Sequence, residues 1–492
     1  MFVSFYNIQF PGFYYDEVLY SNSLYGCKVT GLFDTLSFKV FGTCIPVFVM
    51  SYIGALKTYL LLLFKYFTGV ESPYLLYRGF SILVSCISIF ALYKFNSQLK
   101  FKSFANFFVL LLFSFNLSFI YGAKYDWAPA SISILFKILF LYYSYKISEK
   151  SKVKYVILLL TIASLGIFNK FDFLFFLLPY LITLLFDRKF TRIAVGIVVK
   201  RYVQILLLLV FISISLFFLF FKEYVLTLFS SNSIPSISIE DKAHNLKDLL
   251  LGKSAIDVIL NTVIYSRLEG ILVILTLTFL IIFLFCFHKC GIRLSKFEKT
   301  FLFGTFLYYV VIFIFPKSGG PQHFITTLPL AFIVLGLFVN KFFSFKLVRY
   351  FSVLYLIVYI SHNLILWNIS QKEFEADNVK IFWSKGIDIL YKDFVVPQRN
   401  KKVYATDWGI ANQLVTFSKN KIVIEEPFRS IRTLGTSVSQ KIISSVDTNN
   451  SIAIRFYNTN VLPEATNYFP YNNYEHKEVV YYNGRPIYEV FY

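Results

Sequence analysis

The fold is decided by residues 79–96, GFSILVSCISIFALYKFN, an apolar run with a single basic residue near its end. A helix needs about 20 mainly apolar residues to cross the hydrocarbon core of a bilayer. This run and nine others meet that length or come close to it, and together they predict an all-α membrane bundle of about ten spans. The ten segments are residues 79–96, 104–122, 129–147, 155–169, 172–187, 203–222, 270–288, 299–316, 323–340 and 346–366.

The composition indicates the same class of protein. Hydrophobic residues make up 57% of the 492 positions and charged residues 15%, and the mean hydropathy is +0.62. Soluble domains carry about 25% charged residues. The sequence therefore predicts a multi-pass membrane protein.

The net charge of +20 is unevenly distributed among the loops between these segments. Alternate loops carry 19 Lys and Arg in 54 residues, whereas the loops between them carry 8 in 67. Excess Lys and Arg marks the cytoplasmic side of a membrane protein. The charge is thus a topology signal, and we expect no nucleic-acid partner. The basic loops are 94–102, 146–154, 187–201, 288–299 and 341–349, and the others are 122–128, 169–172, 222–269 and 316–323.

This alternation places Asp126 on the outer face, while the side of Asp16 depends on segment 44–68. The segment is apolar but contains Lys57 and Lys65. A lysine near the middle of a span costs about 2.5–3.5 kcal/mol on insertion scales. Lys65 can snorkel from the end of a span, but Lys57 cannot. We predict that 44–68 lies along the outer interface or re-enters, which puts Asp16 outside; if it crosses, the two acids lie on opposite sides.

The chain changes character after residue 370. Residues 1–370 are predicted to form the transmembrane domain, with a first outer loop at 1–43 and a long outer loop at 222–269. Residues 371–492 are mixed polar and predict a small α/β domain on the outer side. Its expected elements are strands at 402–406, 421–425 and 451–457, a helix at 410–418, and a hairpin at 478–491 on the turn Asn483-Gly484.

Five cysteines, at positions 27, 44, 86, 286 and 290, show no paired metal-ligand spacing. Cys27 and Cys44 could meet outside the membrane, but we expect isolated thiols. No metal site and no cofactor is predicted, although a divalent cation is compatible with the sequence.

A series of short motifs gives the sequence a family resemblance. Their order and sidedness resemble the bacterial branch of glycosyltransferase family 39, the protein mannosyltransferase-like and aminoarabinose transferase-like membrane enzymes with the GT-C fold. The resemblance covers most of residues 10–420, and each motif alone is common. The motifs are Asp16-Glu17, Tyr52-Ile53-Gly54-Ala55-Leu56-Lys57, Phe67-Thr68-Gly69, Arg78, Asp126, Gly166-Ile167-Phe168-Asn169-Lys170, Gly319-Gly320-Pro321-Gln322-His323 and Thr406-Asp407-Trp408-Gly409.

The resemblance departs from the family pattern at the N-terminus. Family members have a span before the Asp-Glu loop, whereas 15 residues precede Asp16 here and none of them forms a segment long enough to cross. We expect either a start further upstream or the loss of that first helix.

The resemblance implies an inverting transfer of a sugar from a polyprenyl-phosphate donor to an acceptor hydroxyl. It assigns the general base to Asp16. Glu17 is a candidate for orienting either the loop or a substrate hydroxyl, and Asp126 is a candidate for binding the acceptor or the donor sugar. Such a transfer needs a base for the acceptor proton and cations for the departing phosphate. Asp126 has a simpler alternative, as an acid favoured at a helix N-terminus by the helix dipole.

Cations on the outer side are few, which makes each a candidate for the donor phosphate. Lys170 and His323 lead because they match family motif positions. Each of the candidates could equally be an interfacial anchor. Lys137, in the middle of a predicted span, is expected to pair within the bundle. The candidates are Lys57, Arg78, Lys170, Lys317 and His323.

Two other classes compete with this hypothesis. A transporter or flippase of lipid-linked sugars should show inverted repeats and broken helices at matching positions, and no such halves are visible. A polysaccharide polymerase or ligase would be expected to carry arginine-rich outer loops, whereas loop 222–269 holds a single arginine. The sugar and the acceptor, whether lipid, protein or glycan, stay open. We expect a bacterial plasma-membrane enzyme whose site faces the extracytoplasmic side.

Overall fold

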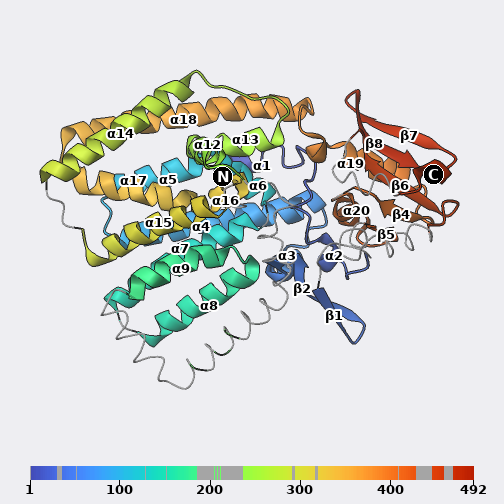
Figure 1. Cartoon of the computed structure of the whole chain (residues 1–492), viewed down its shortest axis with the longest axis horizontal. Coiled ribbons are helices and arrows are strands. Elements are labelled where there is room, and N and C mark those ends of the chain that lie inside the picture. Colours follow the sequence, from blue (N-terminus) through green and yellow to red (C-terminus); the bar gives the residue numbers. More distant parts are fainter. Residues whose placement is uncertain are drawn as a thin grey trace.

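The structure, a computed structural model, consists of a helical bundle with a small sheet domain at one end (Figure 1). The bundle contains the largest cluster of buried hydrophobic side chains, and the sheet domain has a core of its own. The described residues are 2–29, 36–50, 52–127, 129–150, 152–185, 237–290, 294–315, 320–407, 409–427, 446–458 and 469–492, with single residues at 204, 208 and 211.

Six helices of the described chain are long and apolar enough to cross a membrane. Each coincides with a predicted span, so the multi-pass prediction is confirmed. The six are α4 (Phe80–Gln98) with the π-helical turn Leu75–Gly79 that precedes it, α7 (Ala130–Glu149), α14 (Leu268–Cys290), α15 (Lys296–Ile314), α16 (Pro321–Phe324) continued into α17 (Leu328–Phe342), and α18 (Lys346–Glu375).

The other four predicted spans have different outcomes. Segment 104–122 is broken into α5 (Ser103–Phe115) and α6 (Leu117–Tyr125), and the chain bends by 57° between the two helices. The break is at Asn116, whose side chain caps α6 and donates to a carbonyl of another segment. The segments at 155–169 and 172–187 form the shorter apolar helices α8 (Val153–Asn169) and α9 (Phe173–Leu185). The segment at 203–222 lies outside the described residues.

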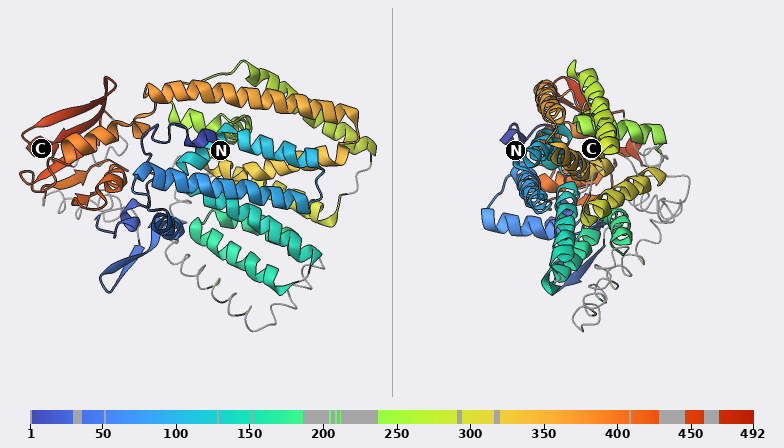
Figure 2. Two further views of the ribbon diagram at one scale, coloured as in Figure 1. Left: turned by 180° about the vertical axis from the view of Figure 1, so that it is seen from behind. Right: turned by 90° about the vertical axis from the view of Figure 1, so that its left-hand side faces the viewer.

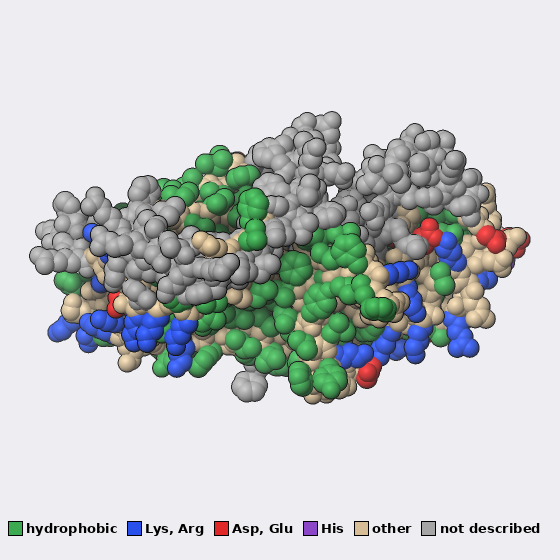
Figure 3. Space-filling view, turned by 90° about the horizontal axis from the view of Figure 1, so that it is seen from below, with side chains coloured by type: hydrophobic (Ala, Val, Ile, Leu, Met, Phe, Trp, Pro, Cys, Tyr) green, Lys and Arg blue, Asp and Glu red, His purple; other side chains and the backbone are tan. Residues whose placement is uncertain are grey.

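Residues of the basic loops meet at one end of the bundle. A cavity of about 450 Å³ at one end is lined by residues from four of the five basic loops, among them Lys100, Glu149, Lys296 and Lys341. These four loops therefore lie at the same end of the bundle, as the alternation of basic and less basic loops along the sequence predicted. Seen from below, Lys and Arg side chains gather at this end and again near the sheet domain, with a mainly apolar surface between the two groups (Figure 3). We call the two ends the basic end and the domain end.

Segment 44–68 does not cross the bundle. It forms strand β2 (Thr43–Met50), strand β3 (Ile53–Gly54) and the 13-residue helix α3 (Leu56–Thr68). Helix α3 lies at the domain end, seen end-on in Figure 1 and across the spans in the right-hand view of Figure 2. Lys57 is in its first turn. This orientation agrees with the predicted interfacial helix.

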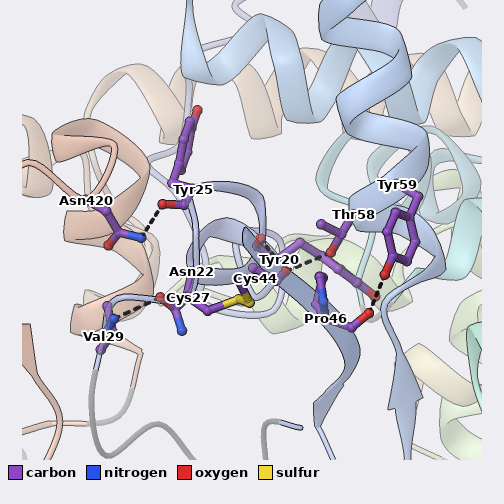
Figure 4. Close-up of a disulfide and its surroundings, with 11 residues drawn as sticks. Tyr20, Asn22, Tyr25, Cys27, Val29, Cys44, Pro46, Thr58, Tyr59 and Asn420 are labelled. Atoms are coloured by element: carbon purple, nitrogen blue, oxygen red, sulfur yellow. Dashed lines mark hydrogen bonds between the residues drawn. A yellow bond between two sulfur atoms is a disulfide. The ribbon is translucent and has the colours of Figure 1, made fainter. Parts of the chain in front are cut away.

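The remainder of the N-terminal region contains α1 (Phe2–Phe5), α2 (Ser21–Leu24) and strand β1 (Leu36–Val40), which pairs antiparallel with β2. A disulfide joins Cys27 to Cys44, with the Cα atoms 6.1 Å apart (Figure 4). The expectation of isolated thiols at these positions was wrong. Spacing along the sequence could not reveal the pair, because the hairpin returns Cys44 to the loop after α2.

The long loop before α14 contributes α12 (Ile239–Leu251) and α13 (Ser254–Ile259) beside the domain end of the bundle. After α18, the chain enters the sheet domain through the 3-10 turn Ile381–Trp383, helix α19 (Gly386–Ile389) and the π-helical turn Leu390–Val395. These turns link the two parts of the molecule.

The sheet domain confirms the predicted βαβ unit and hairpin. Its five strands lie in the order β5-β4-β6-β8-β7, with β4 parallel to both of its neighbours and β8 antiparallel to both of its own. Helix α20 connects β4 to β5 and packs on the sheet. The elements are β4 (Lys402–Ala405), α20 (Ile410–Ser418), β5 (Ile424–Glu425), β6 (Ser451–Phe456), β7 (Lys477–Tyr482) and β8 (Arg485–Phe491).

Candidate active site

The candidate site lies at the domain end, where the N-terminal loop passes between the bundle and the sheet domain (Figure 1). Phe13 of this loop stacks on Tyr74 at the start of the first span, with ring centroids 4.1 Å apart. Tyr14, the next residue of the loop, stacks on Trp383, with ring centroids 4.3 Å apart. Aromatic pairs at these separations add to the stabilisation from buried area. The loop is therefore fixed from both sides immediately before Asp16.

The two acids of this loop have different surroundings. Glu17 is buried and accepts two hydrogen bonds from Arg78, at 2.6 Å from Nε and 2.9 Å from Nη2. Asp16 is half-buried, and no hydrogen bond or ion pair holds its carboxylate among the described residues. A fork-to-fork pair fixes both partners, whereas an unpaired carboxylate is available to another group.

Arg78 has no donor left for a substrate. Its three remaining N–H groups donate to the backbone carbonyls of Ile8, Pro11 and Gly12, at 2.6, 3.0 and 2.9 Å. The guanidinium has five N–H donors in all, and the protein itself occupies every one. The Arg78 side chain thus holds the N-terminal loop in its conformation.

Lys57 and Asp126 meet although they come from different elements. The Lys57 Nζ lies 2.8 Å from Asp126 Oδ2, and both side chains are inaccessible to solvent. The other carboxylate oxygen of Asp126 accepts the backbone N–H of Ser131 in the first turn of α7, at 2.7 Å. Asp126 is thus the helix N-terminal acid of the simpler alternative and an ion-pair partner as well.

A second cluster forms between α8 and α9. Lys170 Nζ lies 3.2 Å from Asp172 Oδ2, and His323 Nδ1 lies 3.7 Å from the same oxygen. Burial would raise the pKa of Asp172, but the positive charge of Lys170 and the nearby imidazole of His323 hold this pKa well below its usual range. Asp172 was not among the predicted site residues. Its only local signal was an acidic residue at the start of an apolar segment, two positions after Lys170.

Asp16 lies within the electrostatic reach of both clusters. Burial raises the pKa of its carboxyl to about 6, although the positive charges of Lys170 and Lys57 act in the opposite direction. A carboxyl whose pKa is moved toward neutrality is suited to exchange protons near neutral pH. The structure therefore brings together Asp16, Lys57, Asp126, Lys170 and His323 of the predicted residues, with Glu17 and Arg78 beside them. Lys317 lies outside the described residues.

Close backbone packing holds the lysines in this arrangement. A Cβ atom on Gly54 would lie 1.9 Å from the carbonyl oxygen of Phe168, so only glycine fits there. The backbone N–H of Phe171 donates to the carbonyl of Tyr52 at 3.0 Å. The two motifs that end in Lys57 and Lys170 are thus in direct contact.

The sheet domain touches the same loop. Gly409, with φ +90°, lies where a Cβ would come within 2.3 Å of the Tyr15 side chain. The preceding motif residue, Asp407, accepts the backbone N–H of Phe456 in β6 at 2.9 Å. Asp407 therefore joins the end of β4 to β6 within the sheet domain.

Lys137 is buried in α7 and does have partners. Its Nζ donates to the hydroxyl groups of Tyr308 and Thr326 at 2.7 and 2.6 Å. Hydroxyl partners of this kind reduce the cost of an ammonium group within a span. Across the described part of the chain, no three His, Cys, Asp or Glu side chains are grouped to hold a metal ion.

The chain resembles known proteins in sequence and in fold. Residues 56–220 match the family model described as Dolichyl-phosphate-mannose-protein mannosyltransferase. A comparison with curated proteins finds no match. Two solved structures are similar over 99% of this chain and 96% of their own: ArnT from Cupriavidus metallidurans in the apo state, with 11% identity and a TM-score of 0.59, and ArnT from the same organism bound to undecaprenyl phosphate, with 10% and 0.56.

At such low identity, the structural likeness is evidence of a shared fold. The matched family model covers α3 through the first apolar helices, the region that supplies Lys57, Arg78, Asp126 and Lys170. Residues 56–220 thus resemble a mannosyltransferase family, and the chain as a whole has the fold of ArnT.

Proposed function

We propose that the chain transfers a sugar from a polyprenyl-phosphate donor to a hydroxyl group on the extracytoplasmic side of a bacterial plasma membrane. The observation that carries the proposal is the unpaired Asp16 carboxylate, whose pKa of about 6 responds to the charges of Lys170 and Lys57. A base beside cations is what transfer from a phosphate leaving group requires. The structure of ArnT bound to undecaprenyl phosphate, a polyprenyl phosphate, supports a donor of this class.

In the proposed reaction, Asp16 accepts the proton of the acceptor hydroxyl as its oxygen attacks the anomeric carbon. The bond from that carbon to the phosphate oxygen breaks, and the configuration inverts. Lys170 steadies the negative charge that develops on the phosphate, with His323 and Lys57 nearby. Glu17 and Arg78 shape the loop that presents Asp16, and Asp126 orients Lys57.

Two observations support the extracytoplasmic placement of this site. The basic loops lie at the opposite end of the bundle, as expected for the cytoplasmic side. The Cys27–Cys44 disulfide is in the loop region next to Asp16. Disulfides persist in oxidising compartments and are rare in the cytosol.

The acidic and basic groups of the site gather at one end of the bundle. A transporter site would be expected near the midplane, so the arrangement favours the enzyme. The test is an assay of membranes containing the protein with a panel of radiolabelled prenyl-phosphate sugars. We expect at least one donor to be consumed by the wild type and not by Asp16→Asn. Equal consumption by both proteins, or by neither protein with any donor of the panel, would contradict the proposal.

A further inference from the structure

The β1–β2 hairpin has two chemically different faces. In an antiparallel pair, residues opposite each other point to the same side of the sheet. Phe38 is opposite Ile45, and Val40 is opposite Thr43. Lys39, opposite Cys44, is on the other side. One face is therefore mainly apolar, and the other carries a lysine and the disulfide.

The apolar face is unprotected within the protein. The exposed fractions are 56% for Phe38, 41% for Val40 and 40% for Ile45, and Phe41 at the tip is fully exposed. Contiguous apolar surface of this kind marks a site of contact with another molecule or with a membrane.

Helix α3 extends this apolar surface. Leu62, Leu63, Tyr66 and Phe67 form a stripe on one side of the helix and are 42, 53, 83 and 79% exposed. Positions i, i+1, i+4 and i+5 share one helix face. The hydroxyl of Tyr59 donates to the carbonyl of Pro46 at 2.6 Å, which joins helix and hairpin (Figure 4).

The location of both elements indicates what covers them. The hairpin projects sideways from the domain end of the bundle, and α3 lies across the spans at the same end (Figures 1 and 2). The sheet domain begins beyond this end of the spans (Figure 1). A bilayer that surrounds the spans therefore has its interface beside the hairpin and α3.

We propose that the hairpin Leu36–Met50 dips its apolar face and its tip residue Phe41 into the lipid leaflet at the domain end. Lys39, on the opposite face, is then directed toward the phosphate head groups. Interfacial elements elsewhere combine an apolar face at the acyl boundary with basic residues at the head groups. A disulfide joins Cys44 of the hairpin to Cys27. The insertion of the hairpin into the lipid therefore also fixes how far the loop that carries Asp16 lies from the membrane surface. The inference depends on the membrane topology and not on the reaction.

The test measures where position 41 lies. Phe41→Trp and, as a matched control on the polar face, Lys39→Trp are reconstituted in nanodiscs with lipids brominated near the top of the acyl chains. The signal of the four native tryptophans is measured in the wild type and subtracted. We expect the bromolipids to quench the tryptophan at position 41 strongly and aqueous iodide to quench it weakly, with the opposite order at position 39.

Two results would overturn the proposal. Strong quenching of position 41 by iodide would place the tip in water. Protection of position 41 from both quenchers would indicate that a second copy or another protein covers the hairpin.

Discussion

Asp16 and Glu17 are adjacent in the chain, yet the carboxylate of Glu17 is paired and that of Asp16 is not. Glu17 is held by two hydrogen bonds from Arg78, which also binds three backbone carbonyls of the same loop. Asp16 is half-buried, unpaired among the described residues, and under the influence of Lys170 and Lys57. Two adjacent acids in one loop can therefore have different roles. Glu17 stabilises the loop, and Asp16 remains available for the role of base that we propose.

The largest expected effect is on transfer by Asp16→Asn. The amide cannot accept the acceptor proton, so we expect kcat to fall by about 10²- to 10⁴-fold, the usual contribution of a general base. Donor affinity should stay within a few-fold of the wild type, because no donor-binding cation is removed. Steady-state transfer and donor binding, measured on the same preparation, provide the check. Wild-type turnover in this variant would refute the assignment of Asp16 as the base.

The second expected effect is on stability, through the other acid of the pair. Arg78→Met leaves Glu17 buried without a partner, which should destabilise the fold by about 3–5 kcal/mol. The double variant Glu17→Gln with Arg78→Met should recover part of this loss. Unfolding in mixed micelles measures both, with Arg349→Met, an exposed position, as the control. A loss below about 0.5 kcal/mol for Arg78→Met, the range of ordinary surface changes, would mean that the pair does not hold the loop.

A smaller effect is expected from Lys170→Met. Removing a buried cation from a charged contact typically costs at least about 2 kcal/mol, so kcat/KM for the donor should fall about 30-fold. Lys146→Met is the matched control, because Lys146 donates to Gln98 at the basic end, far from the site. Equal loss in both variants would show that Lys170 has no special role.

The smallest expected effect is a shift in pH dependence. A base with a pKa of about 6 is active when deprotonated, so the rate should be present above this pH and be lost as the pH falls through about 6. Because the charge of Lys170 lowers the pKa of Asp16, Lys170→Met should move the inflection to higher pH. Rate profiles from pH 4.5 to 8.5 test this, and an inflection that moves to lower pH would contradict the electrostatic coupling.

The spans and the sheet domain were predictable because both rest on local patterns. Apolar length predicted helices such as α4 and α7, and a turn at Asn483-Gly484 predicted the hairpin β7–β8. The interfacial position of α3 followed from the cost of placing Lys57 in a span. These signals are carried by neighbouring residues in the sequence.

The pairings within the site were not predictable in the same way. Arg78 was a candidate for phosphate binding, but its five donors are taken by a loop 61 to 70 positions away in the sequence. Asp172 was overlooked, and Cys27 was expected to be a free thiol. Each of these depends on contacts between distant segments, which a single sequence does not reveal.

The role of Asp16 is tested most directly by a single turnover of enzyme loaded with labelled donor, started by adding acceptor at a series of pH values. For the wild type and for folded Glu17→Gln, the rate of sugar transfer should rise with pH through the inflection near 6 and then level off. Asp16→Asn should give a low rate that does not change with pH. Transfer by Asp16→Asn with the wild-type rate and inflection would show that another group is the base.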